Sequence, residues 1–167
     1  MTETTTDLYS LLEYLGNFLS KRNQTISTAE SCTGGWLGKE ITGSPGSSKW
    51  FGTGLITYSN SAKVKILGVN KETLLKEGAV SESVVREMVI GAMQLGRAEY
   101  GIAISGVAGP GGGSKERPVG TVCFALGNSE EIITSTMHFE GDRDDVRNHS
   151  VIYAFTEINN FLKTLQN

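Results

Sequence analysis

The sequence has 167 residues, of which 38% are hydrophobic, and a formal net charge of −3 at pH 7. This length and composition fit one domain with a buried core, and the lack of a basic excess argues against a nucleic-acid partner. No apolar run approaches the roughly 20 residues that span a membrane. The first residues lack the pattern of a secretory signal, and two cysteines make no disulfide framework, so we expect a cytoplasmic protein.

Helical and β-prone segments alternate along the chain. The first helix is predicted from apolar residues that share one helical face, namely Leu8, Leu11, Leu12, Leu15 and Leu19. In chain order, the patterns predict a helix at 7–22, a strand at 25–28, a helix at 36–41, a strand at 51–58, helices at 60–67, 71–77 and 82–96, a strand at 102–105, a hairpin of strands 119–126 and 132–139 turned near 127–128, and a helix at 142–165. This order predicts an α/β fold, a single three-layer α/β/α domain over residues 1–167 with a mixed sheet.

Polar or glycine-rich segments follow three of the predicted strands, after Thr28, Tyr58 and Ser105. Ligands of open α/β sheets bind beyond the carboxyl ends of the strands. We therefore expect these three segments to form the functional site.

The first of these segments, residues 30–35, opens a predicted helix. Backbone N–H groups at a helix start can hold an anion or a developing oxyanion, and Gly34 and Gly35 let a ligand come close. Ser31 and Cys32 are candidate nucleophiles, although no histidine lies nearby in sequence to activate the thiol. The alternative is that a hydroxyl side chain here only caps the helix.

The second segment brings a lysine close to a strand end. Tyr58 and Lys63 are five positions apart, and a strand end followed by one helical turn aims both side chains at one cleft. A partly desolvated lysine loses pKa and can act as a general base for a serine. Ser48, in the loop before the strand, is a second serine candidate. The alternative is that Ser48 is only a turn residue and that Tyr58 and Lys63 are ordinary surface residues.

The third segment is the glycine-rich loop at residues 106–118, which follows Ser105. Its backbone suits phosphate or carboxamide binding, and Gly106 and Gly109 are the candidate contacts. The loop matches neither a Walker sequence nor the G-x-G-x-x-G pattern of dinucleotide-binding folds. A flexible lid is the alternative.

Two arginines open the last predicted helix, where a positive charge is electrostatically unfavourable. Arg143 and Arg147 are therefore candidates to bind a ligand anion, because a guanidinium fork suits phosphate. The alternative is a salt bridge with the neighbouring acids.

The ligand inventory for a metal is poor. His138 and His149 are the two histidines, they are far apart in sequence, and no Cys-x-x-Cys pair is present. We expect no metal and no cofactor. A histidine-based triad and a Gly-x-Ser-x-Gly elbow are excluded on the same sequence grounds.

Several short motifs occur together in one order over nearly the whole chain. They lie at residues 28–35, 46–48, 57–60, 62–63, 78–82, 105–110, 115–120 and 141–143. In this combination the chain resembles the CinA C-terminal domain family of nicotinamide-nucleotide amidases. Longer members carry an additional N-terminal domain, so the chain is similar to the stand-alone form.

The resemblance implies hydrolysis of nicotinamide mononucleotide to nicotinic acid mononucleotide and ammonia, in pyridine nucleotide salvage and without a metal. Two alternatives stay open: a catalytically silent nucleotide-binding or regulatory module, and an amidase for another small amide. The substrate is the expected partner, and the sequence leaves open whether the chain forms a homo-oligomer.

The resemblance also implies a serine amidase that uses a lysine as its base. Lys63 is then the base, and Tyr58 and one of the two arginines contribute. Ser48 is the first choice of nucleophile and Ser31 the second. Ser105 is assigned to substrate binding.

Overall fold

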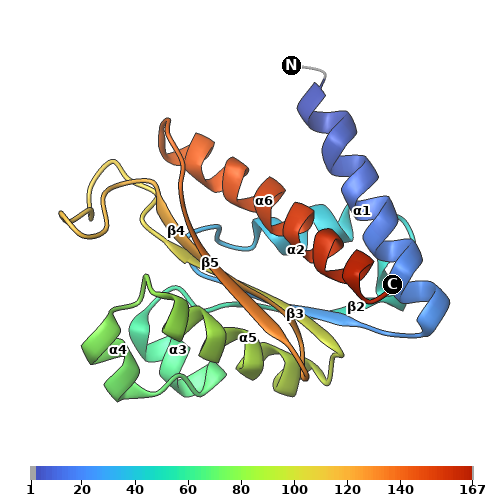
Figure 1. The fold of residues 1–167 in the computed structure, drawn as a ribbon, viewed down its shortest axis with the longest axis horizontal. Coiled ribbons are helices and arrows are strands. Elements are labelled where there is room, and N and C mark those ends of the chain that lie inside the picture. Colours follow the sequence, from blue (N-terminus) through green and yellow to red (C-terminus); the bar gives the residue numbers. More distant parts are fainter. Residues whose placement is uncertain (1–2, 167) are drawn as a thin grey trace.

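The computed structural model describes the backbone of residues 3–166 and the side chains of residues 8–166. It has a five-stranded sheet in the order β2-β1-β3-β4-β5, with helices on both faces (Figure 1). The strands are β1 (Ile26–Glu30), β2 (Phe51–Ile56), β3 (Tyr100–Gly106), β4 (Thr121–Asn128) and β5 (Ile132–His138). The helices are α1 (Glu3–Arg22), α2 (Trp36–Thr42), α3 (Asn60–Leu67), α4 (Lys71–Glu77), α5 (Glu82–Gly96) and α6 (Arg143–Thr164), with a short 3-10 helix, η1 (Ser47–Lys49). The expected α/β domain with a mixed sheet is confirmed.

Strand β1 lies inside the sheet and is buried along its whole length. It pairs in parallel with β2 and β3, whereas β4 and β5 add antiparallel strands beyond β3. The strand was expected at 25–28 but continues to Glu30, because Ala29 and Glu30 are paired on both sides. Pairing with neighbours therefore extends the strand beyond what local sequence indicates.

Two apolar cores lie on the two faces of the sheet. Helices α1, α2 and α6 pack on one face, and α3, α4 and α5 cover the other (Figure 1). The predicted leucine face of α1 is confirmed, since Leu12, Leu15 and Leu19 are buried and the other two leucines pack against the same core.

The position of α3 depends on a glycine in α5. A Cβ built on Gly91 would lie 2.0 Å from the carbonyl oxygen of Leu67, the last residue of α3. Only a residue without a side chain allows this approach. Close packing of α5 thus fixes α3, which carries Lys63.

The loops after β1, β2 and β3 meet at one edge of the sheet, because these strands are parallel. Helix α6 also begins there, and its start is held by a capping box between Asp142 and Asp145.

The β4–β5 turn lies later than expected, since Asn128 is still paired and its side chain accepts hydrogen bonds from the Glu130 and Glu131 N–H groups. Over the part of the chain that the structure describes, no helix has the length and apolarity to cross a membrane.

Candidate active site

A serine and a lysine meet where β1 and β2 end. Lys63, in the first turn of α3, is 1% exposed, and its Nζ lies 2.9 Å from Oγ of Ser31. The same nitrogen lies 2.8 Å from the carbonyl oxygen of Thr57 and 3.2 Å from that of Tyr58. The Ser59 hydroxyl caps α3 by accepting from the Ala62 N–H and so fixes the helix start.

Burial makes Lys63 easier to deprotonate than an exposed lysine. Burial lowers the pKa of Lys63, because the charged form loses its hydration. The three oxygens around Nζ match the three N–H donors of the ammonium form. When Lys63 is neutral, its two N–H donors can keep the Thr57 and Tyr58 carbonyls, which leaves the lone pair for the Ser31 hydroxyl. This geometry equips Lys63 to accept the proton of Ser31.

Cys32, the neighbouring nucleophile candidate, is a poor one. Its thiol is buried, and burial raises the pKa of Cys32 to about 11. Because the thiolate is the reactive form, this side chain is inert near neutral pH.

Ser48 does not lie with the other candidates, contrary to our first choice. It sits exposed in η1, directly before β2 begins. Lys63 follows the other end of β2, and a six-residue strand spans roughly 20 Å. A residue that precedes a parallel strand lies at the amino edge of the sheet, opposite the ligand edge. Ser31, which contacts Lys63, therefore replaces Ser48 as the first candidate for the nucleophile.

Backbone N–H groups at the start of α2 are bound by the side chain of Glu30. The buried carboxylate of Glu30 accepts four hydrogen bonds there. The donors are Thr33 Oγ1 at 2.6 Å and the N–H groups of Gly35, Leu37 and Gly38, each at 3.1 Å. The Gly34 N–H donates to the Ser31 carbonyl. From the sequence we expected oxyanion donors near Gly34 and Gly35 or in the glycine-rich loop. The N–H groups of Gly34 and Gly35 are already used, which corrects the expectation for these two residues.

Replacing Glu30 by glutamine is expected to destabilise the fold by about 2–4 kcal/mol, because the buried amide NH2 group would face the Gly38 N–H or the other donors and the charge-assisted hydrogen bonds are lost. The measurement is the free energy of unfolding in urea. Glu40→Gln, a half-buried carboxylate on the same helix, is the control: Trp36 Nε1 and Lys39 Nζ both donate to its Oε1, so one amide oxygen can keep both contacts. A loss no larger than that of the control would contradict this role for Glu30.

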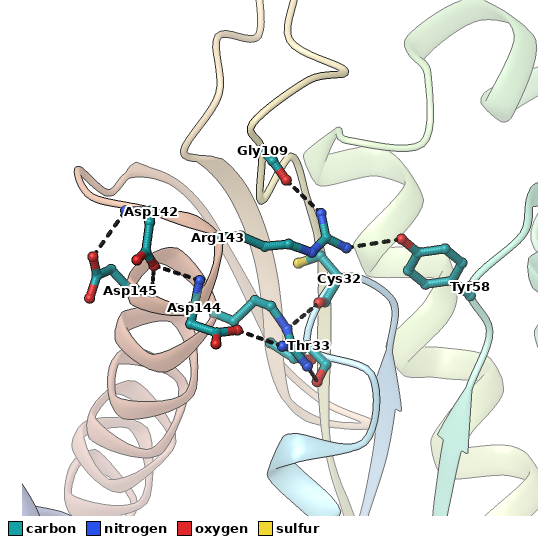
Figure 2. A network of polar contacts seen from close by, with 9 residues as sticks. Cys32, Thr33, Tyr58, Gly109, Asp142, Arg143, Asp144 and Asp145 are labelled. Carbon is teal, nitrogen blue, oxygen red and sulfur yellow. Dashed lines mark hydrogen bonds and ion pairs between the residues drawn. The ribbon is translucent and has the colours of Figure 1, made fainter.

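Arg143 spans the site between the glycine-rich loop and the segment that follows β2. Its Nη1 donates to the Gly109 carbonyl at 2.6 Å and its Nη2 to the Tyr58 hydroxyl at 3.3 Å (Figure 2). Both acceptors are neutral, so neither cancels the guanidinium charge. The Tyr58 hydroxyl faces Arg143 whereas the Tyr58 carbonyl faces Lys63, so the structure does not support a proton relay from Ser31 through this hydroxyl.

Arg147 contacts the turn after Ser31 instead of the glycine-rich loop and Tyr58. It donates to the carbonyls of Cys32 at 3.1 Å and Thr33 at 3.2 Å, and pairs with Asp144 at 3.0 Å. The two arginines of α6 therefore have different surroundings, although they are four residues apart.

A pocket of about 320 Å³ opens above the Ser31–Lys63 pair. It is lined by Ser31, Cys32, Tyr58, Asn60, Lys63, Ala79, Val80, Ser105, Gly106, Val107, Ala108, Gly109, Gly111, Gly112 and Arg143. Ser105, Gly106 and Gly109 are thus brought to the expected place. Asn60, Ala79 and Val80 also line the pocket. The sequence did not single them out, because apart from their place in the motifs nothing in them indicated a functional role.

The glycine-rich loop is anchored on the opposite wall. The guanidinium of Arg117, at its far end, donates to the carbonyls of Val80 and Glu77. These contacts hold the loop against the segment between α4 and α5. Among the described residues, no group of three or more His, Cys, Asp or Glu side chains could hold a metal ion.

The family model of the CinA C-terminal domain matches residues 8–162. The chain belongs to the CinA C-terminal domain family. Nicotinamide-nucleotide amidohydrolase PncC of Escherichia coli strain K12 is 53% identical over 152 residues, covering 90% of this chain and 92% of that protein. The PncC of Enterobacter agglomerans is 43% identical over 93% of this chain and 96% of its own length. The solved CinA superfamily protein from Enterobacter cloacae superposes with a TM-score of 0.90 at 39% identity, over 93% of this chain and 92% of that one.

Proposed function

We propose that the chain is an amidohydrolase that converts nicotinamide mononucleotide to nicotinic acid mononucleotide and ammonia. The observation that carries the proposal is the 2.9 Å contact between Ser31 and the buried Lys63 at the base of a pocket. A nucleophile beside a desolvated base fits acyl transfer, and the curated relatives named above are amidohydrolases of nicotinamide nucleotides. The reaction belongs to pyridine nucleotide salvage, and a cytoplasmic location stays a prediction.

The proposed reaction runs through an acyl-enzyme. Neutral Lys63 takes the proton of Ser31 while Oγ attacks the carboxamide carbon. The C–N bond then breaks, and Lys63 returns the proton to the leaving nitrogen, which departs as ammonia. Water attacks the ester, gives a proton to Lys63, and releases the carboxylic acid, and that proton restores the Ser31 hydroxyl.

The oxyanion of this reaction needs donors close to Ser31. Cys32, the residue after Ser31, lines the pocket, whereas Thr33 is fully buried and does not. We assign the Cys32 N–H to the oxyanion, for which one such donor typically contributes about 3–4 kcal/mol. Ser105, Gly106 and Gly109 also line the pocket, and we assign them to binding of the nicotinamide nucleotide.

Arg143 is the proposed phosphate ligand, because it lines the pocket and its present acceptors are neutral. Arg143→Ala is expected to raise KM for the mononucleotide about 10- to 100-fold, the effect of losing one or two charged hydrogen bonds. The unphosphorylated riboside should be affected much less. Equal proportional losses of kcat/KM on both substrates would show that Arg143 does not bind the phosphate. Tyr58→Phe is the matched control, because it removes the hydroxyl that accepts from Arg143 and keeps both the ring and the guanidinium.

The experiment that tests the proposal is ammonia release by the purified protein from a panel of amides. Nicotinamide mononucleotide is expected to react far better than the riboside, free nicotinamide or the dinucleotide, because the pocket offers Arg143 to a terminal phosphate. A protein that binds the mononucleotide without releasing ammonia would be a silent nucleotide-binding module. Preference for an amide without a phosphate would favour another substrate class.

A further inference from the structure

The glycine-rich loop after β3 has few contacts with the rest of the protein. It projects from the ends of β3 and β4 (Figure 1), and residues 111–116 are all exposed. In the part of the chain that the structure describes, residues 109–117 form hydrogen bonds with other segments at two points only, Gly109 and Arg117. Part of this loop nevertheless lines the pocket. The position of that lining therefore depends on two arginines, Arg143 at one end of the loop and Arg117 at the other.

The guanidinium of Arg117 binds the turn between α4 and α5. Its Nε donates to the Val80 carbonyl and its Nη2 to the Glu77 carbonyl, and a Cβ built on Gly78 would lie 3.6 Å from its Nη1. Glu77 is the last residue of α4, and a cation at the end of a helix satisfies a terminal carbonyl and complements the helix dipole. Val80 itself lines the pocket. Arg117 thus joins two parts of the pocket lining that come from distant segments.

The backbone and the side chain of Arg117 serve different segments. The Ser114 N–H donates to the Arg117 carbonyl at 2.8 Å, and the Arg117 N–H donates to Oγ of Ser114 at 3.0 Å. The backbone therefore belongs to the turn at the tip of the loop, whereas the side chain belongs to residues 77–80. Among the described residues no carboxylate forms an ion pair with Arg117, and the Glu77 carboxylate lies 3.7 Å from Lys76 instead.

We propose that Arg117 is a positioning residue that holds the glycine-rich loop against residues 77–80 and so keeps the pocket in the shape that binds the nucleotide. The inference rests on the proposed function, which supplies the ligand. Without the two hydrogen bonds the loop would populate other positions, since it is exposed and rich in glycine. The apparent affinity for a ligand falls with the population of the binding-competent arrangement, so a loop in place one tenth of the time binds about tenfold more weakly.

The test compares Arg117→Gln with Lys115→Gln, which removes the same charge from an exposed residue of the same loop. In Arg117→Gln, KM for the mononucleotide and the dissociation constant of the acid product are expected to rise at least about tenfold. kcat should change less than about threefold, because saturating ligand restores the bound arrangement and other elements hold the Ser31–Lys63 pair. Lys115→Gln should keep the wild-type values. Arg117→Lys, which keeps the charge but lacks the fork, should lie between the two.

A second measurement does not depend on the substrate. Trypsin can cut the loop after Lys115, whereas the bond after Arg117 precedes Pro118 and resists trypsin. Limited proteolysis without ligand, followed by mass spectrometry, gives the rate of cleavage at Lys115 relative to the exposed Lys49 of η1. In Arg117→Gln this relative rate should rise at least about fivefold, because cleavage follows the population of the open loop.

An unchanged KM in Arg117→Gln would overturn the proposal, and so would an equal rise in Lys115→Gln, which would indicate a general effect of charge. A raised KM with unchanged proteolysis would overturn it in favour of direct contact between Arg117 and the ligand. A kcat lowered as far as KM is raised would overturn it as general damage to the site. If Arg117→Gln does not fold, Arg117→Lys decides by the same comparisons. If the wild type releases no ammonia from the mononucleotide, the proposed function fails, and the proteolysis rates alone decide this inference.

Discussion

Replacing Lys63 by methionine is expected to lower kcat for nicotinamide mononucleotide by about 10⁴-fold, the upper range for loss of a general base. Methionine matches the lysine stem in length and fills the same buried position, but it cannot accept the Ser31 proton. Circular dichroism and thermal melting provide the check that the variant is folded. A folded Lys63→Met protein with near-normal kcat would contradict the assignment of Lys63 as the base.

The pH profile sharpens this test. The neutral amine is the active form, so kcat/KM of the wild type should rise with pH as Lys63 loses its proton. Because burial lowers the pKa of Lys63, the midpoint of this rise should lie below the ordinary lysine value of about 10.4. Lys63→Arg keeps the charge at every accessible pH and should stay inactive throughout. An ionisation of the wild type at or above the ordinary value would contradict the account.

Replacing Ser31 by alanine is expected to have an effect as large, about 10⁴-fold or more in kcat, because no acyl-enzyme can form. Ser48→Ala is the matched control. Ser48 is exposed at the opposite edge of the sheet, so its kcat should remain within about twofold of the wild type. Ammonia release at saturating substrate measures both. An inactive Ser48→Ala beside an active Ser31→Ala would restore the original order of the two serines.

The sequence predicted the elements best where periodicity was strong. The bounds expected for α3, α4 and α5 are those observed, because their caps and apolar faces are local features. Strand β1 was expected too short and β2 too long, since the pairing of Glu30 and the turn after Ile56 depend on neighbouring segments.

The edge that holds the site could also be predicted, because parallel strands end together. The pairing of Ser31 with Lys63 could not, since it joins residues 32 positions apart. Nor does local sequence show that the Glu30 side chain folds onto the start of α2. Arg143 and Arg147 lie in one motif, and their separate roles emerge only from what each side chain contacts.

The most direct test of the central claim is to quantify the products when purified protein is incubated with nicotinamide mononucleotide, with Ser31→Ala in parallel. Mass spectrometry and an ammonia assay report the two products together. The account predicts nicotinic acid mononucleotide and ammonia in equal amounts from the wild type, and neither from Ser31→Ala above the uncatalysed level. Absence of both products from the wild type, release of free nicotinamide instead, or equal turnover by Ser31→Ala would contradict it.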